Sequence, residues 1–421
     1  MRRASQLACA LTLLAACAGS ERTPSASDPT AGALGEGEES SERKQGWVRC
    51  GIDVLVEESF ERLRGRRVAI LTSRIGRDHH GVRTIDRFAE AQGVELIRLF
   101  SPEHGLESAR EGDINDEVDS ATGLPIHSLY GERRAPDASE LAGIDDLIVD
   151  LQDVGVRFYT YATTMGYAMR ACGQAGVRVL VLDRPNPIAP AGVQGPIQDP
   201  DQLSFIAWQP IPLVHGLTLG ELATLYVREF GIECELDVVA MQGWSRTMWY
   251  EDTGVPWIDP SPNLRSPMQA QLYPALGLLE ACGLSVGRGT EAPFECIGAP
   301  WIDSDKLLAR LRELDLPGVQ FTAKAFTPSA SRFEGEPLQG IALRVEQRDA
   351  VQAVELGLQI AWALEREFAA SFDEENVLRR FGSQGVLDAL YEAQDPSVVM
   401  DLWQADVRSF SEIAAGCYLY P

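Results

Sequence analysis

Glu103 and His104 place an acid and an imidazole side by side, shortly after an apolar, partly β-branched run over residues 94–100. Such a run predicts a buried strand. Pro102 cannot continue a central strand and Gly105 frees the backbone to turn, so the strand is expected to end at this pair. In open α/β sheets, ligands bind at the carboxyl ends of the strands. The pair is therefore the first candidate for proton-transfer chemistry. The alternative is a polar turn that faces water.

Carboxylates also stand at the ends of two other apolar runs. Asp150 lies near the end of the run over 145–151 and Asp153 follows that run, while Asp183 follows the run over 177–182. Parallel strands end at one edge of a sheet, so these aspartates are expected near the acid–imidazole pair. The structural alternative is that each aspartate caps a helix or pairs with an arginine.

Carboxylates at strand ends, with aromatic and amide side chains nearby, suit a site for sugars. Glycosidic cleavage needs one protonated carboxyl group to donate to the leaving oxygen. It also needs a second group, usually a carboxylate, to act as nucleophile or to activate water. We interpret Glu103 as the catalytic acid/base. The second group is left open between Asp153, with Asp150 beside it, and Glu295.

Other residues are candidates for holding the substrate, because aromatic faces stack on sugar rings while Asn, Arg and Asp side chains bind hydroxyl groups. Tyr159 and Tyr161 alternate, so both can face one side of an extended segment. The predicted substrate-binding residues are His104, Asp150, Arg157, Tyr159, Tyr161, Asp183, Asn186, His215, Asn263 and Arg288. The alternative is structural: the tyrosines as core, and His215 and Asn263 as parts of loops.

Several common chemistries lack their motifs. No Gly-x-Gly-x-x-Gly follows the first predicted strand and no Walker-type loop is present, so no nucleotide cofactor is expected. The five histidines are scattered and no His-Glu-x-x-His occurs, so no metal site is expected. The formal charge of −25 opposes a nucleic-acid partner, because phosphate binding needs a basic surface.

The order of the predicted elements is typical of a doubly wound fold. Strands over 67–72 and 94–100 flank a helical pattern over 84–92, which predicts parallel pairing through a right-handed crossover. We therefore predict an α/β fold, with a Rossmann-like, mostly parallel sheet in a catalytic domain over 47–283. The composition then changes, and residues 284–421 are predicted to form a smaller α+β domain.

The first 17 residues have the features of a signal peptide. Arg2 and Arg3 precede an apolar stretch over 7–14 that is too short to span a bilayer. The following Leu-Ala-Ala-Cys, which ends at Cys17, resembles the lipobox of bacterial lipoproteins. This implies export and a lipid anchor at Cys17 on the periplasmic face of a membrane, and the absence of an Asp beside it favours the outer membrane. Residues 18–46 are polar and predict a disordered tether.

Six of the eight cysteines lie beyond this N-terminal segment. An exported chain permits disulfides, and Cys50 and Cys417 stand near the two ends of the predicted folded part, where a bridge would join them. The pairing itself is left open. Cys172 and Cys282 fall on helical patterns and are predicted to be core residues.

Six segments together resemble a bacterial family of exo-acting β-N-acetylmuramidases, formerly known only as a conserved domain of unknown function. They occur in the family's order, at 101–105, 150–155, 157–161, 183–187, 260–263, and 287–290 with 293–295. The resemblance extends over nearly all of the predicted folded part. It implies a Rossmann-like domain plus a smaller C-terminal domain, with the site between them. It also implies release of N-acetylmuramic acid from the non-reducing end of peptidoglycan fragments, with Glu103 as the catalytic carboxylate.

The chain leaves the family's pattern directly after Gly105. Members commonly continue with Arg-Gly, whereas this chain has Leu106, Glu107 and Ser108, which makes the turn acidic. Two alternative functions therefore stay open. One is a cell-wall-sugar-binding lipoprotein without catalysis, and the other is a hydrolase of another glycoside.

Overall fold

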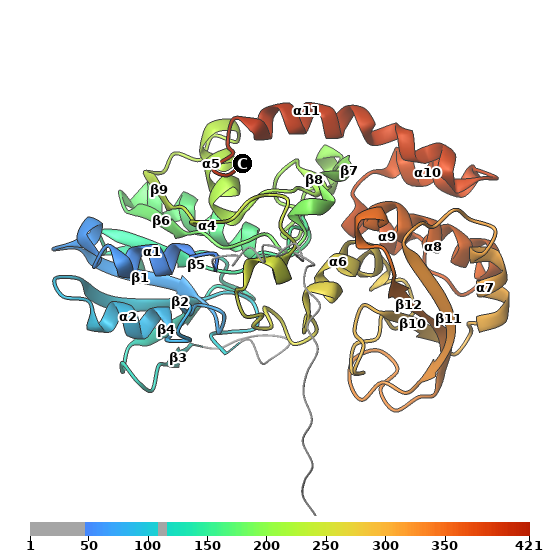
Figure 1. Cartoon of the computed structure of the whole chain (residues 1–421), viewed down its shortest axis with the longest axis horizontal. Coiled ribbons are helices and arrows are strands. Elements are labelled where there is room, and N and C mark those ends of the chain that lie inside the picture. Colours follow the sequence, from blue (N-terminus) through green and yellow to red (C-terminus); the bar gives the residue numbers. More distant parts are fainter. Residues whose placement is uncertain (1–46, 108–115) are drawn as a thin grey trace, which may run out of the picture. The chain divides into compact units, whose positions relative to one another are not determined.

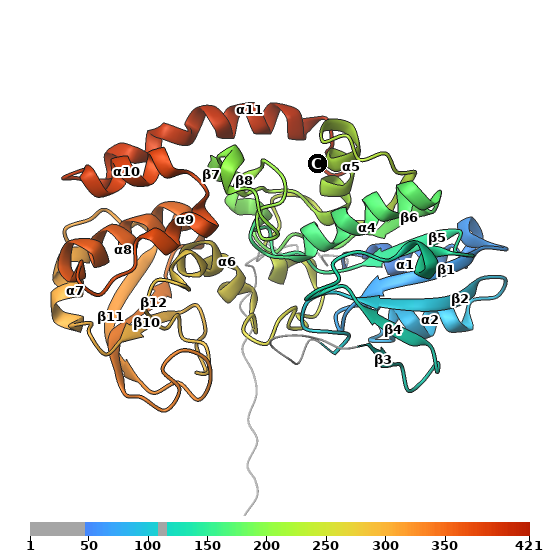
Figure 2. The ribbon, with the colours of Figure 1, turned by 180° about the vertical axis from the view of Figure 1, so that it is seen from behind.

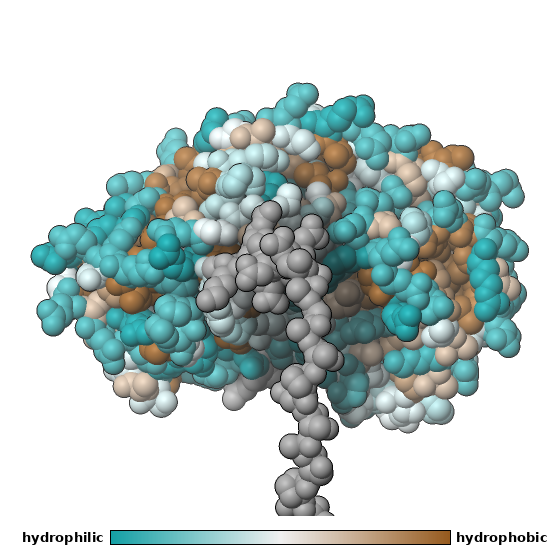
Figure 3. Space-filling model, in the orientation of Figure 1, coloured by the Kyte–Doolittle hydropathy of each residue, from teal (hydrophilic) through white to brown (hydrophobic). Residues whose placement is uncertain are grey.

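The computed structural model describes residues 47–107 and 116–421. Cys17, the predicted signal peptide, the predicted tether and Ser108 lie outside the described residues. The chain from Gly46 to Pro421 forms one compact unit. Within the described residues, no helix is both long and apolar enough to cross a membrane. The face in Figure 3 is largely hydrophilic, with its apolar residues in separate patches.

A seven-stranded sheet dominates the first part of this unit (Figure 1). The strands in spatial order are β3 (Glu117–Val118), β4 (Pro125–Ser128), β2 (Glu95–Ser101), β1 (Arg67–Thr72), β5 (Asp146–Asp150), β6 (Arg178–Leu182) and β9 (Leu236–Val239). All neighbours are parallel except the edge pair of β3 and β4. The chain moves outward from β1 in one direction to β2 and in the other to β5, so the strand order reverses between β1 and β5.

Alternate residues of each central strand face opposite sides of the sheet. Val68 and Ile70 pack in one core with α1 and α2, whereas Ala69 and Leu71 pack in another with α4 and α5. Helices on both faces explain why these strands are continuous apolar runs. The helices of this part are α1 (Gly51–Glu57), α2 (Thr84–Glu90), α3 (Ala138–Leu141), α4 (Tyr161–Ala175) and α5 (Leu219–Glu229), and the paired strands β7 (Gln194–Ile197) and β8 (Pro212–Val214) lie outside the main sheet.

The second part contains an antiparallel sheet in the order β10, β12, β11, and α6 lies between the two sheets in both views (Figure 2). Gly357 lets α8 approach α6, because a Cβ there would lie 2.7 Å from the carbonyl oxygen of Ala275. The elements are α6 (Pro267–Leu276), β10 (Cys296–Ala299), α7 (Ser304–Leu311), β11 (Val319–Phe326), β12 (Leu338–Val345), α8 (Ala353–Phe368), α9 (Glu375–Phe381), α10 (Gln384–Glu392) and α11 (Gln404–Ala415). The predicted α/β fold with a smaller second domain is confirmed. The boundary at 283/284 stays a prediction.

Short 3-10 turns join several of these elements. They are η1 (Glu61–Leu63), η2 (Ala189–Ala191), η3 (Pro200–Gln202), η4 (Tyr250–Thr253), η5 (Gly277–Leu279), η6 (Arg348–Ala350) and η7 (Pro396–Trp403).

The two ends of the described unit meet at the end of β6. Figure 1 shows α11 running back from α10 toward α5. Tyr420 OH donates to Asp183 Oδ2 over 2.6 Å, and the Gly51 N–H donates to the Asp183 carbonyl over 2.8 Å. Cys50 and Cys417 are both buried free thiols, so hydrogen bonds, and not the disulfide that the sequence allows, join the ends.

Candidate active site

A cavity of about 330 Å³ lies beside Glu103. Segments that are distant in sequence form its walls, and the lining residues are Glu103, His104, Phe158, Tyr159, Thr160, Ser261, Tyr273, Glu280, Arg288, Phe294, Ser331 and Arg380. The volume is at the lower end of the range for ligand pockets, roughly 300–1,000 Å³. Five of the predicted site residues meet here: Glu103, His104, Tyr159 and Arg288 line the wall, and Tyr161 contacts Glu103.

Glu103 is positioned by the segment between β5 and α4. Thr160 Oγ1 donates to Glu103 Oε2 over 2.6 Å, and Tyr161 OH donates to the Glu103 carbonyl over 3.3 Å. Among the described residues, no hydrogen bond involves the other carboxylate oxygen, Oε1. One oxygen is therefore fixed while the second remains for a ligand in the cavity.

The turn at this wall is strained. The Gly105 N–H donates to the Pro102 carbonyl over 3.1 Å, and His104, at the third position of the turn, has φ of 73°. A positive φ at this position favours glycine. Phe294 and Ser331, with φ of 59° and 70°, line the same cavity. Backbone strain of this kind persists only where the surroundings enforce it, and it concentrates at functional sites.

Aromatic rings form the inner wall of the cavity. Tyr273 packs edge-on against both Phe158 and Phe294, with ring centroids 5.0 Å and 4.8 Å apart. The rings of Tyr159 and Tyr161 lie 4.7 Å apart, and both hydroxyl groups donate to the Pro260 carbonyl, over 3.0 Å and 2.9 Å. The two rings therefore pack against each other, and of the two Tyr159 lines the cavity whereas Tyr161 does not. The hydroxyl groups are used to hold the loop at Pro260.

A carboxylate held between two arginines also lines the cavity. Glu280 accepts from Arg288 Nε through Oε1 and from Arg380 Nη2, at 3.1 Å, through Oε2. Arg288 also lies over the ring of Phe294, 5.4 Å from its centroid. Arg288 was predicted from its loop, whereas Glu280, directly after η5, and Arg380, on α9, are marked by no local motif.

The aspartate at the end of β5 is used inside the protein. Asp150 is fully buried and accepts from Arg184 Nε at 2.6 Å and Nη2 at 3.0 Å. It also accepts from Thr84 Oγ1, at the first residue of α2, over 2.5 Å. Asp150 therefore does not line the cavity beside Glu103, and its pairing with an arginine matches the structural alternative.

Asp153, His215 and Asn186 likewise have their partners inside the protein. Asp153 Oδ2 accepts from the Gly155 N–H over 2.6 Å. His215 Nε2 lies 3.2 Å from the same oxygen without the alignment of a hydrogen bond, and its Nδ1 accepts from the Leu217 N–H over 3.2 Å. Asn186 Nδ2 donates to the Leu217 carbonyl over 2.9 Å. All three predicted residues are buried and lie outside the cavity lining.

Arg157 joins the two parts of the unit. Its buried guanidinium donates to four backbone carbonyls, those of Pro196, Ile211, Arg380 and Phe381. Burial lowers the pKa of Arg157 to about 9, so the group is still charged at neutral pH. The last two carbonyls belong to α9, and Arg157 therefore fixes the helix that carries Arg380 into the cavity.

Two further predicted residues stand next to lining residues. Glu295 follows Phe294, and its Oε1 accepts from Gln269 Nε2 over 2.8 Å. Asn263 is buried, and its N–H donates to Ser261 Oγ over 3.4 Å. Neither side chain is part of the lining.

Asp183 is fully buried at the end of β6. Thr218 Oγ1 and the Gly220 N–H, at the start of α5, donate to its carboxylate over 2.7 Å and 2.9 Å, and Tyr420 OH donates to it as well. Burial outweighs these bonds and raises the pKa of Asp183 to about 6. This aspartate holds α5 and the C-terminal residues to the sheet, away from the cavity lining.

The raised pKa of Asp183 has a consequence for stability. The folded chain binds this proton more tightly than the unfolded chain, so the stabilisation is complete below about pH 4 and is lost as the pH rises to about 6. Relative to Asp183→Asn, the wild type should lose roughly 2 kcal/mol of unfolding free energy between these pH values. Urea denaturation at both pH values measures the difference, and parallel pH profiles for the two proteins would contradict it.

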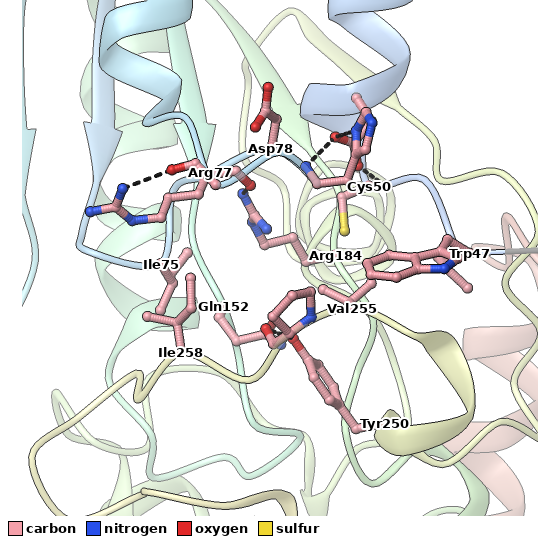
Figure 4. Close-up of a pocket in the computed structure, with 15 residues that line it drawn as sticks. Trp47, Cys50, Ile75, Arg77, Asp78, Gln152, Arg184, Tyr250, Val255 and Ile258 are labelled. Atoms are coloured by element: carbon pink, nitrogen blue, oxygen red, sulfur yellow. Dashed lines mark hydrogen bonds and ion pairs between the residues drawn. The ribbon is translucent and has the colours of Figure 1, made fainter.

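The place where the strand order reverses, a common ligand site in such sheets, holds only a small cavity here (Figure 4). Its volume is about 80 Å³, far below the usual ~300 Å³ minimum for a ligand pocket. Arg184, Gln152 and Cys50 face it (Figure 4), and burial raises the pKa of the Cys50 thiol to about 12. The larger cavity lies one strand further out, at the end of β2.

Residues 283–287 spell Gly-Leu-Ser-Val-Gly, a pattern that some hydrolases use to present a serine nucleophile. That use requires a sharp strand-to-helix turn. Here Ser285 pairs with Gly298 as an isolated bridge and is buried, and its Oγ accepts from the Gly287 N–H over 3.2 Å. The segment is therefore structural.

The hydrogen bond from Thr160 predicts a loss of activity. In Thr160→Val the carboxylate of Glu103 loses its only side-chain partner among the described residues, and we expect kcat to fall about tenfold because the group is no longer aligned. Thr160→Ser keeps the hydroxyl and should retain at least half of the activity. A Ser variant as impaired as the Val variant would contradict this role.

The comparisons with known proteins agree on one family. The models described as exo-beta-N-acetylmuramidase NamZ, N-terminal and C-terminal, match residues 68–268 and 271–420. Peptidoglycan beta-N-acetylmuramidase NamZ of Bacillus subtilis (strain 168) is 42% identical over 328 residues, which are 77% of this chain and 79% of that protein.

Two solved structures of DUF1343 family proteins from Bacteroides fragilis NCTC 9343 share the fold. The first has a TM-score of 0.82 at 36% identity, and the second 0.73 at 28%. Both alignments cover 89% of this chain and 99% of the other.

Proposed function

The chain belongs to the NamZ family of exo-β-N-acetylmuramidases and is a glycosidase, and we propose that Glu103 is its catalytic acid/base. The prediction of an enzyme that acts on peptidoglycan sugars is confirmed. The role of Glu103 rests on one observation. It lines the cavity with one carboxylate oxygen held by Thr160 and the other without a hydrogen bond among the described residues.

A glutamate in this arrangement can protonate the glycosidic oxygen as the bond to the departing sugar breaks. The aromatic wall of Tyr159, Tyr273 and Phe294 supplies faces against which the sugar ring packs, and it excludes water from one side. Glu280 is the other carboxylate in the lining, and it is engaged with two arginines. The proposal therefore assigns the acid/base role to Glu103 alone and leaves the attacking group open.

The assay for this function compares two chromogenic glycosides. We expect the purified protein to hydrolyse a β-N-acetylmuramide and to leave the corresponding β-N-acetylglucosaminide nearly untouched. Turnover of the glucosaminide at a similar rate would contradict the muramyl specificity and favour a hydrolase of another glycoside.

We also propose that the chain is exported and anchored through a lipid at Cys17, so that it acts on the periplasmic face of a membrane. The support is the sequence around Cys17, with its charged start and short apolar stretch. In bacteria fed a labelled fatty acid, the wild type should carry the label and partition with membranes, whereas Cys17→Ser should do neither. An unlabelled wild type in the soluble fraction would overturn the anchor.

A further inference from the structure

Two arginines that line the cavity share one carboxylate. Arg288 and Arg380 meet at Glu280, which binds Nε of one and Nη2 of the other. All three side chains are largely buried, with 21%, 20% and 16% of their surfaces exposed. A guanidinium carries five N–H donors in a planar fork, so the bond from Nη2 of Arg380 to Glu280 occupies only part of that head.

Contacts within the protein position both arginines without a ligand. Arg157 donates to the Arg380 carbonyl over 3.1 Å and so fixes the end of α9. Arg288 lies over the Phe294 ring. A preorganised fork binds a planar carboxylate bidentately at a low entropic cost. Glu280 both aligns the arginines and offsets one of their two charges.

The substrate supplies an anion of the matching kind. N-acetylmuramic acid differs from N-acetylglucosamine by a lactyl ether on the sugar ring, and the lactyl group ends in a carboxylate. Glu103 and the arginine pair line one cavity of about 330 Å³, so a ring bound for cleavage at Glu103 is within reach of both arginines.

We propose that Arg380, together with Arg288, binds the lactyl carboxylate and that Glu280 positions the two heads. This inference rests on the muramidase function and on the cavity beside Glu103 as its site. The arginine pair then determines specificity: with a ring that lacks the lactyl carboxylate, the donors of Arg380 that Glu280 does not use have no ligand acceptor, which penalises binding of the wrong sugar.

The test uses a chromogenic β-N-acetylmuramide and its lactyl methyl ester, which keeps nearly the same shape but carries no charge. For the wild type, kcat/KM should be about 30- to 100-fold higher for the acid than for the ester, as expected for hydrogen bonds to a charged group. In Arg380→Gln this ratio should fall below about 5, mainly through an increase in KM for the acid. The ratio is independent of the fraction of active enzyme, so partial misfolding of the variant does not affect the result.

Arg379→Gln is the matched control. Arg379 is the exposed neighbour on α9 and does not line the cavity, so its variant should keep the wild-type ratio. Arg380→Lys keeps the charge without the fork and should give an intermediate ratio. An unchanged ratio in Arg380→Gln, or an equal loss on acid and ester, overturns the proposal.

Failure of the catalytic assignment gives a different result. Glu103→Gln should lower turnover of the acid and the ester alike and leave their ratio at the wild-type value. A Glu103→Gln variant with undiminished activity would show that Glu103 is not the catalytic acid/base. The acid-to-ester ratio of kcat/KM would still test the role of Arg380.

Discussion

Glu103→Gln is expected to lower kcat for β-N-acetylmuramide hydrolysis by about 10³-fold, within the range typical for the loss of a general acid/base. Glutamine keeps the size of the side chain, and its amide oxygen can still accept from Thr160. What the variant lacks is a proton to donate to the leaving oxygen. KM and the urea midpoint should therefore stay close to those of the wild type.

Two other glutamates serve as controls for this measurement. Glu107 is exposed at the end of the same turn, so Glu107→Gln should behave as the wild type. Glu295 was a candidate for the second catalytic group. Because its Oε1 is engaged by Gln269 and the side chain does not line the cavity, Glu295→Gln should lower kcat less than tenfold. A loss in Glu295→Gln as large as in Glu103→Gln would return Glu295 to the catalytic role.

Arg184→Met is expected to destabilise the fold by about 3–5 kcal/mol, the cost typical of removing one partner of a buried ion pair. Arg184 is 6% exposed and Asp150 not at all. The variant leaves the Asp150 carboxylate in the core with Thr84 as its remaining side-chain donor among the described residues. It also removes the bond from Arg184 to the Arg77 carbonyl, so the loop after β1 loses an attachment.

Urea denaturation followed by circular dichroism measures this loss. Arg64→Met is the control, since Arg64 and its partner Glu61 are 67% and 65% exposed and such pairs contribute little. It should change the unfolding free energy by less than about 0.5 kcal/mol. A loss below about 1 kcal/mol in Arg184→Met would contradict a stabilising role for the pair.

The secondary structure of the first part could be predicted closely. The strand over 67–72 coincides with β1, and the run over 94–100 is displaced from β2 by one residue. Every residue of β1 after Arg67 is buried, so that run is mostly apolar and its limits are visible in the sequence, whereas β2 is buried only over its last three residues. Thr218 and Glu221 have the spacing of a capping box and form one, with Thr218 N donating to Glu221 Oε2 over 2.9 Å. Sequence patterns are sufficient to predict these features because a strand and a capping box each depend on residues that are close together in the sequence.

The carboxylates at strand ends show where such patterns stop being sufficient. Asp150, Asp153 and Asp183 stand, like Glu103, at or just after the ends of predicted strands. The sequence pattern therefore does not distinguish these four carboxylates. In the fold, the three aspartates are buried and bound to partners within the protein. A carboxylate enters the core only when donors from other segments meet it. Which carboxylate does so depends on long-range packing.

The sequence by itself determined the sheet, the turn that presents Glu103, and the absence of a nucleotide-binding loop, since each depends on neighbouring residues. The family was recognisable from six short segments for the same reason. Only the tertiary structure showed that Glu280 and Arg380 line the same cavity as Glu103. Glu280 and Arg380 lie 177 and 277 positions beyond Glu103, on elements without a motif, and they reach the cavity because α9 packs on η5 and is held by Arg157. Residues so far apart in the sequence meet only through tertiary packing, and short sequence motifs do not reveal such contacts.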